Sequence, residues 1–176
     1  QSLKTWTLKI RDGVTWANGE AFDADDIVFT IQTLLNDETQ SLNEAANMQQ
    51  WVERVERIDG LTAQFNLKSP NPRFQLDHFS VKVWGGLIII PQHIWQGKDP
   101  FTFTFYDKEK GWPFGTGAYK LMQAAENEFV YDRCDTWWGS ETGFMEMPIP
   151  KRLVWIVSGA EENTSFLAAD GQLDSI

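Results

Sequence analysis

Cysteine, histidine and long apolar segments are all scarce in this sequence of 176 residues. Its one cysteine, Cys134, has no partner for an internal disulfide or for a metal site built from several cysteines. The two histidines, His78 and His93, lie far apart, and the sequence shows no partners that would make either one catalytic or metal-binding. No apolar run approaches the length of a transmembrane helix.

Positive charge is also in short supply. Fifteen Lys and Arg residues face 25 Asp and Glu residues, which gives a formal net charge of −10. Such a chain is repelled by phosphate backbones and by anionic lipid, so nucleic acid is not an expected partner.

Aromatic residues, by contrast, are abundant: the chain carries 9 Trp, 12 Phe and 3 Tyr. Each ring buries a large apolar area, so a broad core with a partly covered interface would account for many of them. A platform that stacks against sugars or peptide side chains is the alternative. The sequence leaves both interpretations open.

The first half of the chain reads as mixed α and β structure. Alternation predicts strands at 6–10 and 14–16, and Asp23 is a suitable N-cap for a helix whose apolar face begins at Ile27. Two alternating runs, 51–58 and 61–67, flank Asp59-Gly60 and predict a β-hairpin. The polar stretch 41–50 fits a helix or a loop. A short helix is expected at 74–79, a short buried strand at 87–90 and a helical turn at 91–95.

The second half predicts an irregular connection at 101–110, a tight turn at 115–117 and an antiparallel pair at 118–122 and 128–133. A surface connection at 139–150, a strand at 151–157 and a helix at 160–169 follow. A further strand is expected to begin at 173–176. The expected strand–helix–strand unit reaches only the start of its second strand. We therefore expect the sequence to be a piece of a longer protein.

Acidic residues and hydroxyls give no sign of catalysis. The acidic residues between 12 and 37 do not match the spacing of a calcium loop, and turn formation and helix capping explain them. Ser158 and Ser165 lie outside any Gly-x-Ser-x-Gly context. No enzymatic activity, metal or cofactor is therefore predicted.

Four segments resemble motifs of one family. Residues 8–28 place a strand, an Arg-Asp-Gly turn, an aromatic strand, a Gly turn and an acid-capped helix in the order found in family 5 extracellular solute-binding proteins. These are the peptide-, nickel- and oligosaccharide-binding subunits of ABC importers. Residues 115–119, 131–139 and 168–174 resemble three later elements of the family. Ala118, Trp137 and Gln172 stand where proline, tyrosine and glutamate are usual, and these departures leave the inference about the fold undisturbed.

The resemblance implies an α+β or α/β fold of the type II periplasmic-binding-protein kind, in which two lobes close on a solute. Residues 1–100 would form the family's extra small α+β domain, with hairpins and one long helix. Residues 101–176 would form a connection and part of the first lobe, incomplete at its C-terminal end. Trp137, Trp138, Asp174 and Ser175 would lie near the ligand cleft. For the tryptophans, core packing of Trp137 with a rim position for Trp138 is an equally simple explanation. For Asp174, a structural role at a strand edge is the favoured explanation.

The implied function is periplasmic or other extracytoplasmic solute capture, with membrane association through ABC permease subunits. Oligopeptides are the first expectation for the solute. An oligosaccharide is the alternative, and a nickel chelate stays open. A carbohydrate-active enzyme whose rings line a subsite would be a different class of protein, and it would need two carboxylates across a cleft.

Overall fold

The chain divides into two compact units. The computed structural model describes residues 3–80, 86–157, 159 and 161–174. The first unit spans Gln1–Thr104 and the second spans Phe105–Ile176. Each unit contains its own three-stranded antiparallel sheet. Assignment of these units to the family's extra domain and first lobe stays a prediction.

The sheet of the first unit has the strand order β1-β3-β2. Its strands are β1 (Thr5–Lys9), β2 (Val52–Asp59) and β3 (Thr62–Leu67). The predicted hairpin at Asp59-Gly60 is confirmed, since Asp59 pairs with Thr62 and its Oδ1 accepts the Leu61 N–H at 2.8 Å. This turn fixes the register that brings Val55 opposite Phe65, with Trp6 of β1 on the other side of Phe65.

The long helix α1 (Ala24–Leu35) begins where its capping residue predicts. Asp23 Oδ1 accepts the backbone N–H of Asp25 at 2.8 Å, while Asp26 Oδ2 accepts the backbone N–H of Asp23 at 3.2 Å. This reciprocal capping box satisfies helix donors that would otherwise lack partners. The polar stretch after α1 resolves into the helix α2 (Ala45–Trp51), which runs directly into β2.

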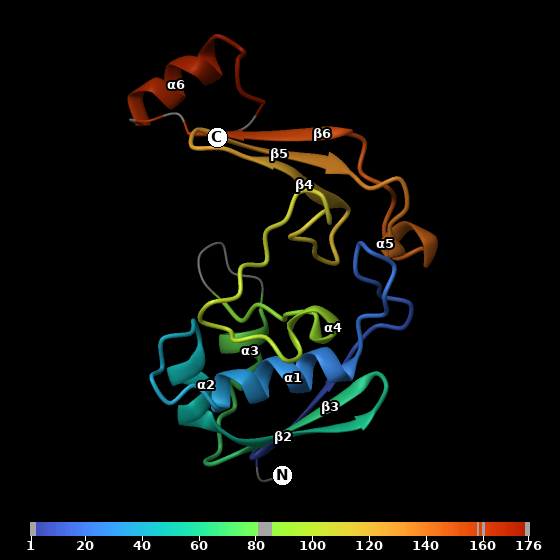
Figure 1. The fold of residues 1–176 in the computed structure, drawn as a ribbon, viewed down its shortest axis with the longest axis vertical. Coiled ribbons are helices and arrows are strands. Elements are labelled where there is room, and N and C mark those ends of the chain that lie inside the picture. Colours follow the sequence, from blue (N-terminus) through green and yellow to red (C-terminus); the bar gives the residue numbers. More distant parts are fainter. Residues whose placement is uncertain (1–2, 81–85, 158, 160, 175–176) are drawn as a thin grey trace. The chain divides into compact units, whose positions relative to one another are not determined.

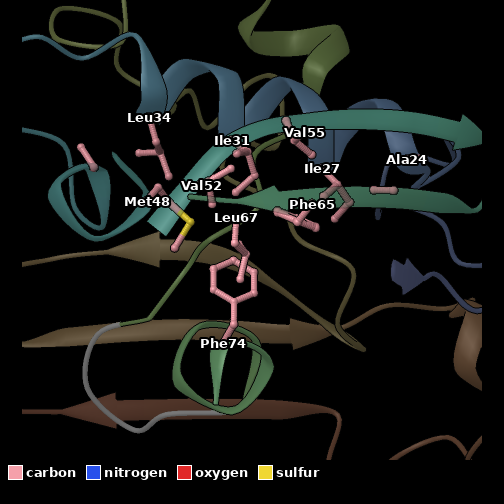
Figure 2. Close-up of a cluster of buried hydrophobic side chains, with 12 residues drawn as sticks. Ala24, Ile27, Ile31, Leu34, Met48, Val52, Val55, Phe65, Leu67 and Phe74 are labelled. Atoms are coloured by element: carbon pink, nitrogen blue, oxygen red, sulfur yellow. The ribbon is translucent and has the colours of Figure 1, made fainter. Parts of the chain in front are cut away.

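The core of the first unit lies between α1 and the sheet. Figure 2 shows Ile27, Ile31 and Leu34 of α1 together with Val52, Val55 and Phe65 of the strands, all of which are buried. Phe65 is only 1% exposed. Its ring lies 5.6 Å from that of Phe74 on the short helix α3 (Phe74–Phe79) and 5.3 Å from that of Phe79. Many of the aromatic residues in this unit are therefore core residues.

The prediction of a strand at 87–90 is wrong. Residues 86–90 have no regular secondary structure, and Ile88 is 74% exposed. Side chains of α1 hold this segment: Thr30 Oγ1 accepts the N–H of Ile90 at 3.0 Å, and Asp26 Oδ1 accepts the N–H of Gln92 at 2.8 Å. The helical turn that follows, α4 (Gln92–Trp95), is as predicted.

The strand predicted at 14–16 is also absent as a regular strand. Residues 12–22 form turns joined by one isolated bridge between Thr15 and Ala21. The backbone N–H of Trp16 and the carbonyl of Glu20 close this turn at 2.8 Å. Trp16 is 4% exposed, so the alternation reflected burial of one ring and not membership of a sheet.

The second unit is built on the sheet β4-β5-β6 (Figure 1). Its strands are β4 (Tyr119–Ala124), β5 (Glu128–Arg133) and β6 (Arg152–Ile156), and its helices are α5 (Trp138–Glu141) and α6 (Glu161–Ala169). The predicted antiparallel pair, the strand near 151–157 and the helix near 160–169 are confirmed. The expected strand at 173–176 is not: Leu173 and Asp174 lie outside regular structure, and Ser175 and Ile176 lie outside the described residues.

Candidate functional site

A single carbonyl anchors the two adjacent tryptophans singled out from the sequence. Thr116 lies in the bend between Gly115 and Gly117, just before β4. Its backbone oxygen accepts the Nε1–H of Trp137 at 2.9 Å and the Nε1–H of Trp138 at 2.6 Å. Both rings are half-buried. The structure therefore joins two segments that the sequence places more than 20 residues apart.

The strands bring these segments together. The Cys134 N–H bonds to the Ala118 carbonyl at 2.8 Å, which extends the pairing of β4 and β5 to the edge of the site. Trp137 is the N-cap residue of α5, and its extended backbone turns the chain into that helix. A Cβ added to Gly139 would lie 2.4 Å from the Trp137 ring, so only glycine lets this ring fold back onto the helix.

Three rings form what we call the aromatic cluster: Trp137, Trp138 and Phe144. The two indoles meet edge to face, with centroids 5.5 Å apart at 61°. Trp138 stacks on Phe144 with centroids 5.3 Å apart and planes 16° apart. Phe144 is 44% exposed. The cluster therefore presents aromatic surface to its surroundings.

Four side-chain donors of the cluster and of the end of α5 are bonded to backbone carbonyls within the chain. Besides the two indole N–H groups, Ser140 Oγ donates to the Trp137 carbonyl at 2.9 Å, and Thr142 Oγ1 donates to the Trp138 carbonyl at 2.8 Å. These four donors are therefore not available to a ligand, whereas the ring faces of the cluster are partly exposed.

Charged residues gather at the neighbouring ends of β5 and β6. A shallow depression there is lined by Asp132, Arg133, Asp135, Lys151 and Arg152. Arg152 binds Asp132 in a bidentate pair, with Nε–Oδ1 at 2.6 Å and Nη2–Oδ2 at 2.8 Å. This hydrogen bonding outweighs partial desolvation and lowers the pKa of Asp132. Arg133 Nη1 donates to the carbonyls of Pro148 and Ile149.

The remaining predicted site residues fall elsewhere. Asp174 is exposed and lies in a bend, and no described hydrogen bond or ring contact joins it to the tryptophans. No regular strand includes Asp174 in the described residues, and its strand-edge role stays a prediction. Ser175 lies outside the described residues.

Sequence reasoning missed Thr116, Gly139 and Phe144. The Gly-Thr-Gly sequence predicts a turn, but nothing in it indicates that its central carbonyl accepts two indoles. Phe144 lies six residues after Trp138 and beyond the end of α5, which is not a spacing that brings two side chains together on a helix, so no local pattern indicated it.

Acidic residues and histidines show no metal-binding arrangement in the described part of the chain, where no group of three or more His, Cys, Asp or Glu side chains could hold an ion. Asp23 and Asp26 cap α1. His78 Nδ1 lies 3.4 Å from Glu44 Oε2 and His93 Nε2 lies 3.0 Å from Asn18 Nδ2. Among the same described residues, no helix has both the length and the apolar character needed to cross a membrane.

Comparison with solved structures identifies the class of fold. A crystal structure of a mannohexaose-bound oligopeptide ABC transporter, periplasmic oligopeptide-binding protein from Thermotoga maritima, superposes with a TM-score of 0.75 at 26% identity. The match covers 98% of this chain and 30% of that one. The fold is thus that of a periplasmic binding protein with mixed α and β structure, as the sequence predicted.

Sequence comparison agrees. Protein XP55 of Streptomyces lividans is 28% identical over 172 residues, or 97% of this chain and 28% of that protein. The periplasmic alpha-galactoside-binding protein of Rhizobium meliloti (strain 1021) is 24% identical over 182 residues, or 97% of this chain and 26% of its own length. The model for bacterial extracellular solute-binding proteins, family 5 Middle, matches residues 1–176.

The chain belongs to the family 5 extracellular solute-binding proteins, which confirms the resemblance seen in the sequence. It spans less than a third of the length of these relatives.

Proposed function

We propose that the protein containing this chain captures a solute outside the cytoplasm for an ABC importer and passes it to the membrane permease. Family membership over the whole chain is the observation that carries this proposal. In this assignment residues 1–100 are the family's extra small domain, and residues 101–176 contribute to the first of two lobes. Closure of the lobes would stabilise the bound state, so affinity would depend on the balance of open and closed forms.

An oligopeptide is the solute that the aromatic cluster supports best. The cluster offers the faces of Trp138 and Phe144, while the nearby indole and hydroxyl donors are bonded within the chain. An apolar peptide side chain needs only such a surface. A sugar ring can stack in the same way, but its hydroxyl groups also need hydrogen-bond partners, because a buried hydroxyl without one costs free energy.

An oligosaccharide is the second candidate, and two comparisons favour it. The similar Thermotoga protein holds mannohexaose, and the Rhizobium relative is an alpha-galactoside-binding protein. Polar partners for sugar hydroxyls would then come from the part of the protein outside residues 1–176.

A thermal-shift screen of the full-length protein separates these solutes. Pooled di- to pentapeptides and pooled oligosaccharides are compared at equal concentration. A ligand present at a hundred times its dissociation constant adds about 2.7 kcal/mol of stability, which is readily detected. Stabilisation by peptides supports the first candidate, and stabilisation by sugars alone supports the second. Stabilisation by neither pool would count against both.

A further inference from the structure

The sequence contains one Asn-Gly pair, Asn18-Gly19, and it lies in the turn at residues 12–22. Both residues are exposed, and Gly19 has a φ of +90°. A Cβ added to Gly19 would meet no atom within 4 Å. Because glycine has no side chain, its backbone nitrogen can approach the side-chain carbonyl carbon of the preceding asparagine without hindrance. That approach is the first step of asparagine deamidation.

The side-chain amide of Asn18 is held at both of its ends. Its Oδ1 accepts the backbone N–H of Glu20 at 3.2 Å, and its Nδ2 lies 3.0 Å from Nε2 of His93 on α4. A backbone N–H can only donate, so Oδ1 must face Glu20 and the amide NH2 group must face His93. In the neutral imidazole, Nε2 is therefore the acceptor and the ring proton lies on Nδ1.

The nitrogen that would attack is held as well. The Gly19 N–H donates to the Trp16 carbonyl at 2.9 Å, and the Trp16 N–H donates to the Glu20 carbonyl at 2.8 Å. Trp16 is itself buried, which fixes the position of its carbonyl. Deamidation therefore requires the side-chain amide of Asn18 and the Gly19 N–H to leave their partners together.

We propose that Asn18 is a deamidation site of this protein and that His93 limits the reaction by holding the side-chain amide. In the reaction the Gly19 nitrogen loses its proton to solvent and forms a bond to Cγ of Asn18. The bond from Cγ to the side-chain nitrogen then breaks, that nitrogen takes up a proton and leaves as ammonia, and a cyclic imide remains. Water opens the imide to aspartate or isoaspartate. His93 is a positioning residue, and the inference is independent of the solute.

The products would change the contact between the turn and α4. Aspartate at position 18 has no NH2 group to donate to His93 and brings a negative charge in its place. Isoaspartate also routes the main chain through the former side chain, which lengthens the turn. The bonds from Gly19 to Trp16 and from Trp16 to Glu20 depend on that length. Modification therefore loosens the hold of the turn on α4.

Peptide mapping of the full-length protein by mass spectrometry tests the site. The protein is incubated at mildly alkaline pH beside a synthetic peptide of residues 12–24, which lacks His93. Conversion of Asn18 in the folded protein is expected to be at least about tenfold slower than in the peptide, because several hydrogen bonds must break together. Conversion as fast as in the peptide would overturn the proposal.

Substitutions of the two histidines separate the role of His93 from general stability. His93→Ala is expected to speed the conversion of Asn18 by about threefold to tenfold, the factor that one hydrogen bond of ordinary net strength contributes. His93→Gln should restore slow conversion, since its side-chain oxygen can accept from Asn18 Nδ2. The control is His78→Ala, which removes the buried imidazole near Glu44 and leaves the turn untouched.

Near-ultraviolet circular dichroism shows whether each variant is folded. Faster conversion in His93→Ala, with slow conversion in His93→Gln and His78→Ala, supports the proposal. Equal acceleration by both alanine variants would overturn it, since general unfolding would then control the reaction. Equal rates in His93→Ala and the unsubstituted protein, failure of His93→Gln to slow the reaction, or no conversion of Asn18 in any variant would also overturn it.

Discussion

The indole nitrogen of Trp16 donates to the carboxylate of Asp26 at 3.0 Å, and Asp26 is only 3% exposed. The same carboxylate accepts the backbone N–H groups of Asp23 and Gln92. One buried side chain therefore holds the turn at residues 12–22, the start of α1 and the segment that leads into α4.

Replacement of Asp26 by alanine is expected to destabilise the first unit by about 3 kcal/mol, because several buried donors lose their acceptor. Trp16→Phe should cost about 1 kcal/mol through loss of a single hydrogen bond. The control is Asp25→Ala, which removes an adjacent carboxylate with a side chain 42% exposed and a surface ion pair to Arg57. Urea unfolding measures all three, and equal effects of the Asp25 and Asp26 variants would contradict this account.

Asp26 should make the stability of the first unit depend on pH, with its contribution greater at low pH. Burial raises the pKa of this carboxyl, although hydrogen bonds from Gln92, Trp16 and Asp23 oppose the shift. A raised pKa in the folded state favours folding at low pH, and that contribution is lost as pH rises through the folded pKa. The free energy of unfolding of the unsubstituted chain, measured relative to that of Asp26→Asn, should therefore increase as pH falls from 7 toward 4. A constant difference would show that the pKa of Asp26 is not raised in the folded state.

Asp132 should behave in the opposite way. Its hydrogen bonds to Arg152 lower its pKa, so its contribution to stability is present above the ordinary aspartate pKa of about 3.9 and is lost as pH falls through the lowered value. A carboxyl titration by nuclear magnetic resonance should give a midpoint below that of a free aspartate. Arg152→Met should raise this midpoint, and an unchanged midpoint would mean that the ion pair does not persist in solution.

Gly139→Ala tests the packing of the aromatic cluster. The new Cβ would lie 2.4 Å from the ring of Trp137, so the ring must move, at an expected cost of about 1–3 kcal/mol. Gly117→Ala is the control, since a Cβ there meets no atom within 4 Å. Tryptophan fluorescence should shift for the first variant and not for the second. Identical spectra and stabilities would show that Trp137 does not rest on Gly139.

Trp138 offers a test of recognition by ring faces. Trp138→Phe keeps a ring against Phe144 and loses the bond to Thr116, whereas Trp138→Ala loses both. In the full-length protein, ligand affinity is expected to fall by less than about threefold for the first and by at least about tenfold for the second, as for other buried aromatic contacts. The ligand is the best compound from the thermal-shift screen. Unchanged ligand affinity for Trp138→Ala would show that the aromatic cluster does not contribute to the ligand-binding site.

Local signals in the sequence were sufficient for much of this fold. Asp23 marked the start of α1, and Asp59-Gly60 marked the hairpin, because capping and turn formation depend on residues a few positions apart. Residues 87–90 show that local signals are not always sufficient. Their composition favours a strand, but the N–H of Ile90 is bonded to the side chain of Thr30, 60 positions away. No local pattern contains that partner.

The candidate site, too, could be predicted only in part from the sequence. The aromatic motif drew attention to Trp137 and Trp138, but their common acceptor, the Thr116 carbonyl, is a backbone atom that any residue would supply. Only the pairing of β4 with β5 brings it within reach. Asp174 was chosen by resemblance alone, and its role near a ligand stays a prediction.

Native mass spectrometry of the full-length protein, purified directly from its own cells, tests the central claim most directly. A solute-binding protein that closes around its ligand should retain some of it through purification. Bound masses that match short peptides and that disappear on denaturation are expected. Bound masses spaced by hexose units would contradict the peptide assignment, and a protein that holds no solute and gains none from either pool would contradict the import role itself.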